Sequence, residues 1–139
     1  MSLTNVKNDW SLYQDLWKIM IAALNKKIVL NSPASPVSPF PKNDKSQWRK
    51  WARAVKGVIA LEENLEITDV ALKQNTALLA AHHKAAAAVS VGSPQESEVK
   101  DFLDNLELVN KEVQKDQRFH AALDIGEALA GAIKQAQAA

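Results

Sequence analysis

The sequence predicts an all-α protein, a bundle of three to four helices built on a long antiparallel helical hairpin, with an N-terminal helix joined by a proline-rich linker. Three observations predict this class. The chain has 139 residues, which suits one domain with a single core. Aromatic residues make up only 6% and glycines number only 4, whereas sheet proteins need aromatic and β-branched residues with frequent turns. Apolar residues also recur at the three- and four-residue spacing of a helix face.

Residues 1–31 are predicted to form one helix that starts near Asn8 or Ser11, where Ser11 and Gln14 fit a capping box. Its apolar stripe is unusually wide, so the helix needs cover on more than one side. We therefore expect it to be deeply buried in its own chain or exchanged, as an arm, into a neighbouring molecule. The residues of the stripe at helical spacing are Trp10, Tyr13, Trp17, Met20, Leu24 and Ile28.

Residues 32–44 are predicted to be a linker, because their prolines cannot continue a helix and favour an extended, semi-stiff chain. Thirteen such residues span roughly 40 Å at about 3.1 Å each. This reach allows a surface loop over one monomer or a connection to an exchanged arm. Residues 45–139 then form the helical hairpin core, and the whole chain is one structural domain.

The stretch Ser46–Val91 is predicted to be one long amphipathic helix, or two helices in close succession. A weak point lies at residues 67–70, where β-branched side chains lower the helix propensity and Thr68 can cap a new helix. The apolar or small residues that define the face are Trp48, Trp51, Val55, Val58, Leu65, Leu72, Leu79 and Ala86.

A tight turn is predicted between this stretch and a last helix that runs toward Gln135. Gly92 can take the left-handed conformation that ends a helix. Ser93 suits the N-cap, Pro94 suits the first helical position, and Glu96 completes a capping box. These residues predict a helix–turn–helix hairpin.

Pairing the two helices about this turn exposes a conflict in the predicted hairpin. Leu72 would face Val113 in an apolar layer, but Asp69 would face Asp116 in the next. Two like charges repel when buried, which raises a carboxyl pKa. We therefore expect a break near Thr68, or a far half that turns toward the first helix or a partner chain.

The tryptophans of the two N-terminal segments are the candidates for a partner interface, because the apolar face between residues 48 and 65 lacks a matching face in the hairpin. A second candidate is the basic stretch 42–56, whose local net charge is +5. Its cations fall on the helix face opposite the tryptophans, which favours an electrostatic patch for an acidic partner or for nucleic acid. The predicted partner interface comprises Trp10, Tyr13, Trp17, Trp48, Trp51 and Val55. The predicted patch comprises Lys45, Arg49, Lys50, Arg53 and Lys56.

Several function classes lack support in the sequence. There is no cysteine, no glycine-rich phosphate loop and no nucleophile elbow. His83 and His120 would lie roughly 27 Å apart along the hairpin, so we predict no metal site and no cofactor. No stretch approaches the ~20 apolar residues of a membrane span, and the N-terminus does not resemble a secretory signal. We expect a cytoplasmic protein that is not an enzyme, and we infer no small-molecule substrate.

The sequence favours a non-enzymatic helical assembly or structural protein. It would self-associate as a homo-oligomer or pack against partner helices, as a coat or scaffold subunit of a virion or other particle does. The alternative is a helical nucleic-acid-binding protein that uses the basic stretch 42–56. Mass measurement in solution separates an assembling protein from a monomer, and oligonucleotide binding at low salt tests the alternative.

Overall fold

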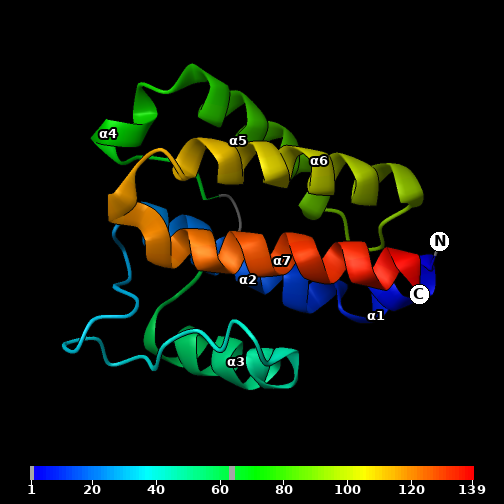
Figure 1. Ribbon diagram of the computed structural model, residues 1–139, viewed down its shortest axis with the longest axis horizontal. Coiled ribbons are helices and arrows are strands. Elements are labelled where there is room, and N and C mark those ends of the chain that lie inside the picture. The colour runs from blue at the N-terminus through cyan, green and yellow to red at the C-terminus, as the bar shows by residue number, and fades with distance from the viewer. Residues whose placement is uncertain (1, 63–64) are drawn as a thin grey trace.

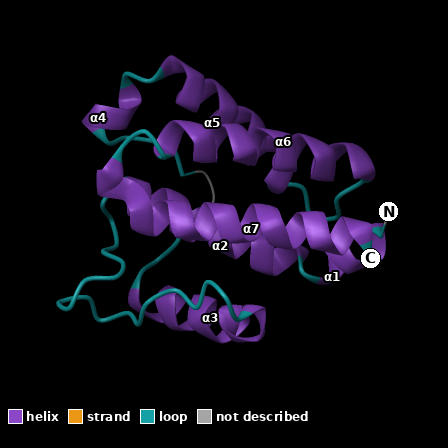
Figure 2. Ribbon diagram, viewed as in Figure 1, coloured by secondary structure: helices purple, strands orange, loops and turns teal. Residues whose placement is uncertain are grey.

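A computed structural model describes residues 2–62 and 65–139, and all the regular secondary structure in these ranges is helical (Figure 2). This confirms the predicted all-α class. Two short 3₁₀ turns, Lys45–Gln47 and Gln117–Phe119, precede α3 and α7. The helices are α1 (Leu3–Asn8), α2 (Trp10–Leu24), α3 (Trp48–Val58), α4 (Val70–Lys73), α5 (Thr76–Val89), α6 (Glu96–Val113) and α7 (His120–Ala138).

The helices are arranged around α2 and α7, which pack against each other in the middle of the molecule (Figure 1). The α5–α6 pair lies along one edge, and α3 lies along the opposite edge against α2. The two chain ends meet, since α1 packs against α7 and the Ser2 backbone N–H donates to the Gln137 carbonyl at 3.0 Å.

The wide apolar stripe of the first segment is buried within its own chain. The chain bends at Asp9, so α1 and α2 replace the single helix that the sequence predicts. The predicted Ser11–Gln14 capping box is wrong, because Asp9 occupies the N-cap and the Gln14 amide instead donates to the Val89 and Val91 carbonyls. The buried residues of α2 are Trp10, Leu12, Tyr13, Leu16, Trp17, Ile19, Met20, Ile21, Ala22 and Leu24.

The stretch Ser46–Val91 is not one helix, nor two in close succession. α3 ends at Val58, Ile59 is extended, and the described residues up to Asp69 are not helical. Leu65 and Ile67 are buried in this segment, so the chain gains apolar burial there without a helix. The break is much longer than the predicted one near Thr68, and Asp69 rather than Thr68 caps the next helix.

The α5–α6 turn differs in detail from the one that the sequence predicts. Gly92 does not take the left-handed conformation. The N-cap of α6 is Gln95, which shares a capping box with Glu98, so the helix is capped two residues later than predicted. The predicted last helix is interrupted between Val113 and His120, and its second half, α7, packs back against α6.

Candidate functional site

Three of the predicted interface residues lie on α2 and contact other parts of the same chain. The Trp10 indole donates from Nε1 to the Val91 carbonyl at 2.9 Å. The Trp17 ring stacks on His82 of α5, with 5.5 Å between the ring centroids. Tyr13 is buried, and the Lys45 ammonium donates to its hydroxyl at 3.4 Å.

The other three residues lie on α3, where Trp48 and Trp51 are covered by the proline-rich segment. The Trp48 Nε1 donates to the Pro41 carbonyl at 2.7 Å, and the Trp51 Nε1 donates to the Ser38 carbonyl at 2.8 Å. The Phe40 ring packs against both indoles, with centroid distances of 5.5 and 5.0 Å. Val55 is fully buried. All six predicted interface residues are therefore satisfied within one chain, and their role toward a partner stays a prediction.

Most of the predicted basic patch forms ion pairs that fasten α3 to the α1–α2 segment. Asp9 pairs with Lys45 at 2.9 Å and with Arg49 at 2.8 Å, and Lys56 pairs with Asp15 at 3.3 Å. Partial burial raises the pKa of the Asp9 carboxyl, but Lys45 and Arg49 outweigh it and leave this pKa below its usual value. These three cations form ion pairs within the chain, and the role of the patch toward a partner stays a prediction.

Lys50 and Arg53 are the cations of this patch that point outward. Both are exposed, and no ion pair joins either of them to another described residue. At 100° per residue they fall on the side of α3 opposite its buried Trp51 and Val55. We call Lys50 and Arg53 the basic face of α3.

The outward side of α6 carries the opposite charge. Asp101 is exposed and forms no ion pair with a described residue, whereas Asp104 pairs with Lys100. Leu108, one or two turns further along, is an apolar side chain that is 51% exposed. We call Asp101, Asp104 and Leu108 the acidic face of α6. As whole helices, α3 carries four basic residues and no acid, a formal charge of +4, while α6 carries six acids and two bases, a formal charge of −4.

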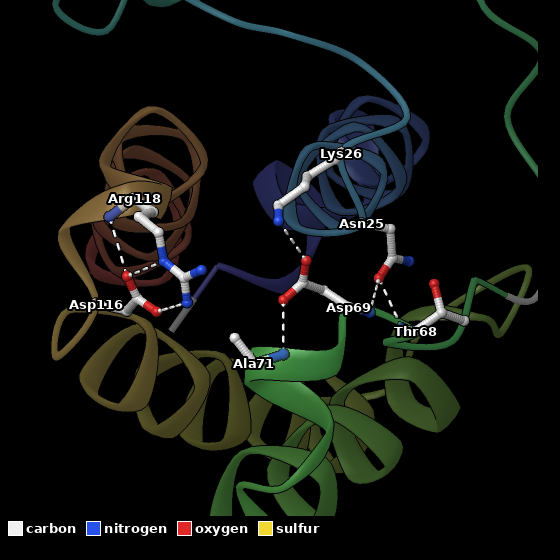
Figure 3. Close-up of polar contacts among 7 residues, drawn as sticks. All are labelled: Asn25, Lys26, Thr68, Asp69, Ala71, Asp116 and Arg118. Carbon is white, nitrogen blue, oxygen red and sulfur yellow. Dashed lines mark hydrogen bonds and ion pairs between the residues drawn. The ribbon is translucent and has the colours of Figure 1, made fainter.

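The predicted conflict between Asp69 and Asp116 is resolved by separate cations (Figure 3). Asp69 pairs with Lys26 at 3.0 Å, and Asp116 pairs with Arg118 at 2.6 Å. The pKa of Asp69 is therefore lowered, chiefly by Lys26, and Arg118 lowers the pKa of Asp116 to about 2. Neither carboxyl pKa is raised, because each carboxylate lies beside its own cation.

The same junction fixes the segment after α3 to the end of α2. The Asn25 side-chain oxygen accepts from the backbone N–H groups of Thr68 and Asp69, at 2.7 and 3.3 Å (Figure 3). Its amide nitrogen donates to the Glu66 carbonyl at 2.6 Å. These contacts make the junction a structural clamp, since each polar group is satisfied by its neighbours.

A cavity of about 570 Å³ lies between α2, α5 and the segment after α3. At its wall His82 is 1% exposed, and neither ring nitrogen forms a hydrogen bond with a described residue. Sequence reasoning missed this cavity because its wall includes Leu65 and Glu66, which were expected on a continuous helix. Among the described residues, no group of three or more His, Asp or Glu side chains could hold a metal ion.

Acidification is expected to destabilise the protein through His82. Burial, and next the adjacent His83, lower the pKa of His82 below its usual 6.5. As the pH falls below about 6.5 the unfolded chain binds a proton that the folded chain resists, so the free energy of unfolding drops by up to about 1.4 kcal/mol per pH unit. Urea unfolding between pH 7.5 and 5.5 (about two units) measures this slope.

The adjacent histidine supplies the control for this pH dependence. His83→Gln, at an exposed position, should keep most of the slope, because burial is the first cause of the lowered His82 pKa, whereas His82→Gln should reduce it far more. Equal slopes in the two variants would show that His82 does not cause the acid sensitivity.

The lengths of the helices and three comparisons with known proteins complete the description of the site. Over the part of the chain that the structure describes, no helix is long and apolar enough to cross a bilayer. No protein-family model matches the chain, and neither the curated proteins nor the solved structures yield a significant match.

Proposed function

We propose that the protein is a non-enzymatic helical subunit that self-associates head to tail, with the basic face of α3 on one copy against the acidic face of α6 on the next. The observation that carries this proposal is the separation of charge. α3, where Lys50 and Arg53 lack ion pairs with described residues, and α6, with its formal −4, lie on opposite edges of the molecule, with α2 and α7 between them (Figure 1).

Almost all the large apolar side chains are buried within one chain, which limits the kind of contact that can join two copies. The large apolar side chains that stay exposed are scattered, namely Val29, Val58, Val70 and Leu108. One of them lies where the proposed contact needs it, because Leu108 belongs to the acidic face of α6. An interface of this kind has a small apolar centre within a charged rim.

The expected strength of a contact between two copies follows from its ion pairs and its small apolar centre. An exposed ion pair contributes only about 0.2–1 kcal/mol and is weakened by salt. A single contact between two subunits is therefore weak, and association depends on concentration and ionic strength. A contact between two different faces leaves one free face on each copy of a pair, so further copies can add. Such contacts build rings or open filaments, as coat and scaffold subunits require.

Charge reversal on the two faces tests this proposal. Light scattering at low salt should show the mass of the wild type rising with concentration, and high salt should reverse the rise. Lys50→Glu with Arg53→Glu should abolish the rise, as should Asp101→Lys with Asp104→Lys. Mixing the two variants should restore it, because each then offers the face that the other lacks.

The controls separate association through these two faces from a general effect of surface charge. Lys73→Glu changes an exposed charge on α4, outside both faces, and should leave association unchanged. A wild type that stays monomeric at every concentration in low salt would contradict the proposal. Binding of an oligonucleotide without self-association would instead favour the nucleic-acid alternative, for which only Lys50 and Arg53 of the predicted patch remain free of ion pairs with described residues.

A further inference from the structure

The cavity between α2, α5 and the segment after α3 has no part in the proposed assembly, which uses α3 and α6. Its volume of about 570 Å³ lies within the roughly 300–1,000 Å³ that is typical of small-molecule sites. Three of its lining residues, Trp17, Leu65 and Val89, are buried apolar or aromatic side chains. The cavity therefore has room for a molecule of one or two rings and a wall that keeps water from one side of it.

Two flat rings form part of this wall. The Trp17 indole and the His82 imidazole are stacked, with 5.5 Å between the ring centroids and 22° between the ring planes. Both residues are buried, and they come from different helices, α2 and α5, so the packing of those helices fixes the orientation of the rings. A wall of this kind suits a planar aromatic ligand.

The polar side chains of the wall differ in whether they have partners. The Gln14 amide nitrogen donates to the Val89 and Val91 carbonyls, at 2.8 and 3.1 Å. His82 is 1% exposed, yet neither of its ring nitrogens forms a hydrogen bond with a described residue. A buried polar group without a partner costs free energy, so a ligand that supplies the missing hydrogen bond is favoured.

The protonation of His82 decides which ligand group it binds. Burial, and next the adjacent His83, lower its pKa, so at neutral pH the imidazole has one N–H donor and one acceptor nitrogen. The Leu65 backbone acts on this pKa in the upward direction, as a nearby acceptor does, so the N–H lies on the side of Leu65. The other nitrogen remains an acceptor, and its matching group on a ligand is a donor.

The charges of the wall favour a ligand without net charge. Lys18 and Glu66 are the lining residues with ionised side chains among those described, and their charges are opposite. A ligand with a net charge would be attracted by one of them and repelled by the other.

We propose that this cavity is a binding site for a small neutral aromatic compound with one hydroxyl or ring N–H donor, its ring beside the Trp17–His82 pair and its donor on the acceptor nitrogen of His82. The site is independent of the proposed self-association, since its lining residues belong to neither the basic face of α3 nor the acidic face of α6. Phenol is the simplest probe of this class. Anisole is the matched control, because it has the same ring and oxygen but a methyl group in place of the hydroxyl hydrogen.

The first experiment tests the hydrogen bond to His82. NMR of the full chain with isotope-labelled histidine follows the ring nitrogens while each probe is added. Phenol should shift the acceptor nitrogen of His82 saturably, and anisole should bind roughly tenfold more weakly, the usual effect of one hydrogen bond. No saturable shift with phenol, or equal affinities for the two probes, overturns the proposal.

A variant of His82 separates the hydrogen bond from simple filling of the cavity. His82→Phe keeps a planar ring beside Trp17 and removes the acceptor nitrogen. The preference for phenol over anisole should therefore disappear in this variant, as measured by the backbone amide shifts of α5. A preference that persists in His82→Phe overturns the assignment of the donor to His82.

The second experiment tests the location of the site with two neighbouring alanines of α5. Ala86 is half-buried and lines the cavity, whereas Ala87 is exposed and does not. Ala86→Leu should abolish binding of both probes because it fills the space, and Ala87→Leu should leave binding unchanged. Unchanged phenol binding in a folded Ala86→Leu variant overturns the location. If Ala86→Leu does not fold, the comparison of wild type with His82→Phe decides the proposal.

Discussion

Replacing Gly126 with alanine is expected to destabilise the protein by roughly 1–3 kcal/mol, the usual cost of overpacking a core. Gly126 of α7 faces Asn110 of α6 and Met20 of α2, so three helices meet at this point. A Cβ there would overlap the Asn110 side-chain oxygen and lie 2.8 Å from the Met20 methyl carbon. The methionine end can move, but Asn110 is only 9% exposed and must shift within the core.

Gly131 on the same helix is the matched control. A Cβ added there meets nothing within 4 Å, and the position is exposed. Gly131→Ala should therefore stabilise the protein by about 0.5–1 kcal/mol, through the higher helix propensity of alanine. Urea unfolding followed by circular dichroism measures both variants. The close packing of α7 on α6 and α2 would be refuted if both substitutions stabilised the protein.

Removal of the Phe102 ring is expected to cost about 3–5 kcal/mol, the range for deleting a buried aromatic side chain. Phe102 is 0% exposed, and its ring meets Trp10 and Trp17 edge to face, with centroid distances of 5.8 and 5.7 Å. These contacts join α6 to α2 across the molecule. Phe102→Ala should therefore lower the urea midpoint strongly, and a cost of this size approaches the whole stability of a small domain.

Leu108 supplies the comparison on the same helix. It is half exposed, so Leu108→Ala should change the free energy of unfolding by about 0.5 kcal/mol or less. If the two substitutions on α6 had similar effects, the aromatic contact between α6 and α2 would not hold the fold together.

The sequence predicted the helical class from composition. From the width of one apolar stripe it predicted that the first segment needs cover, but it left open whether its own chain or a neighbouring molecule supplies that cover. It did not predict the long break after Val58. No glycine or proline interrupts residues 59–69, and local propensity there is only weakly against a helix. The break arises from tertiary contacts, since Asn25 clamps the backbone of Thr68 and the core buries Leu65.

The candidate site was likewise predicted only in part from the sequence. Helical periodicity placed the tryptophans of α3 and its cations on different faces, as the structure has them. Periodicity could not show that Asp9 and Asp15 would neutralise most of those cations, because these carboxylates arrive from another helix. It also treated α3 and the proline-rich segment as separate elements, although Trp51 and Phe40 pack them together.

The central claim about this fold is that α2 forms its core and is not a detachable arm, and amide hydrogen exchange tests it most directly. α2 packs against α3 and α7, and its tryptophans contact α5 and α6. Its amides should therefore exchange only through global unfolding, with the free energy that urea unfolding gives. Exchange of the α2 amides at a markedly lower free energy than those of α5 and α6 would contradict the claim.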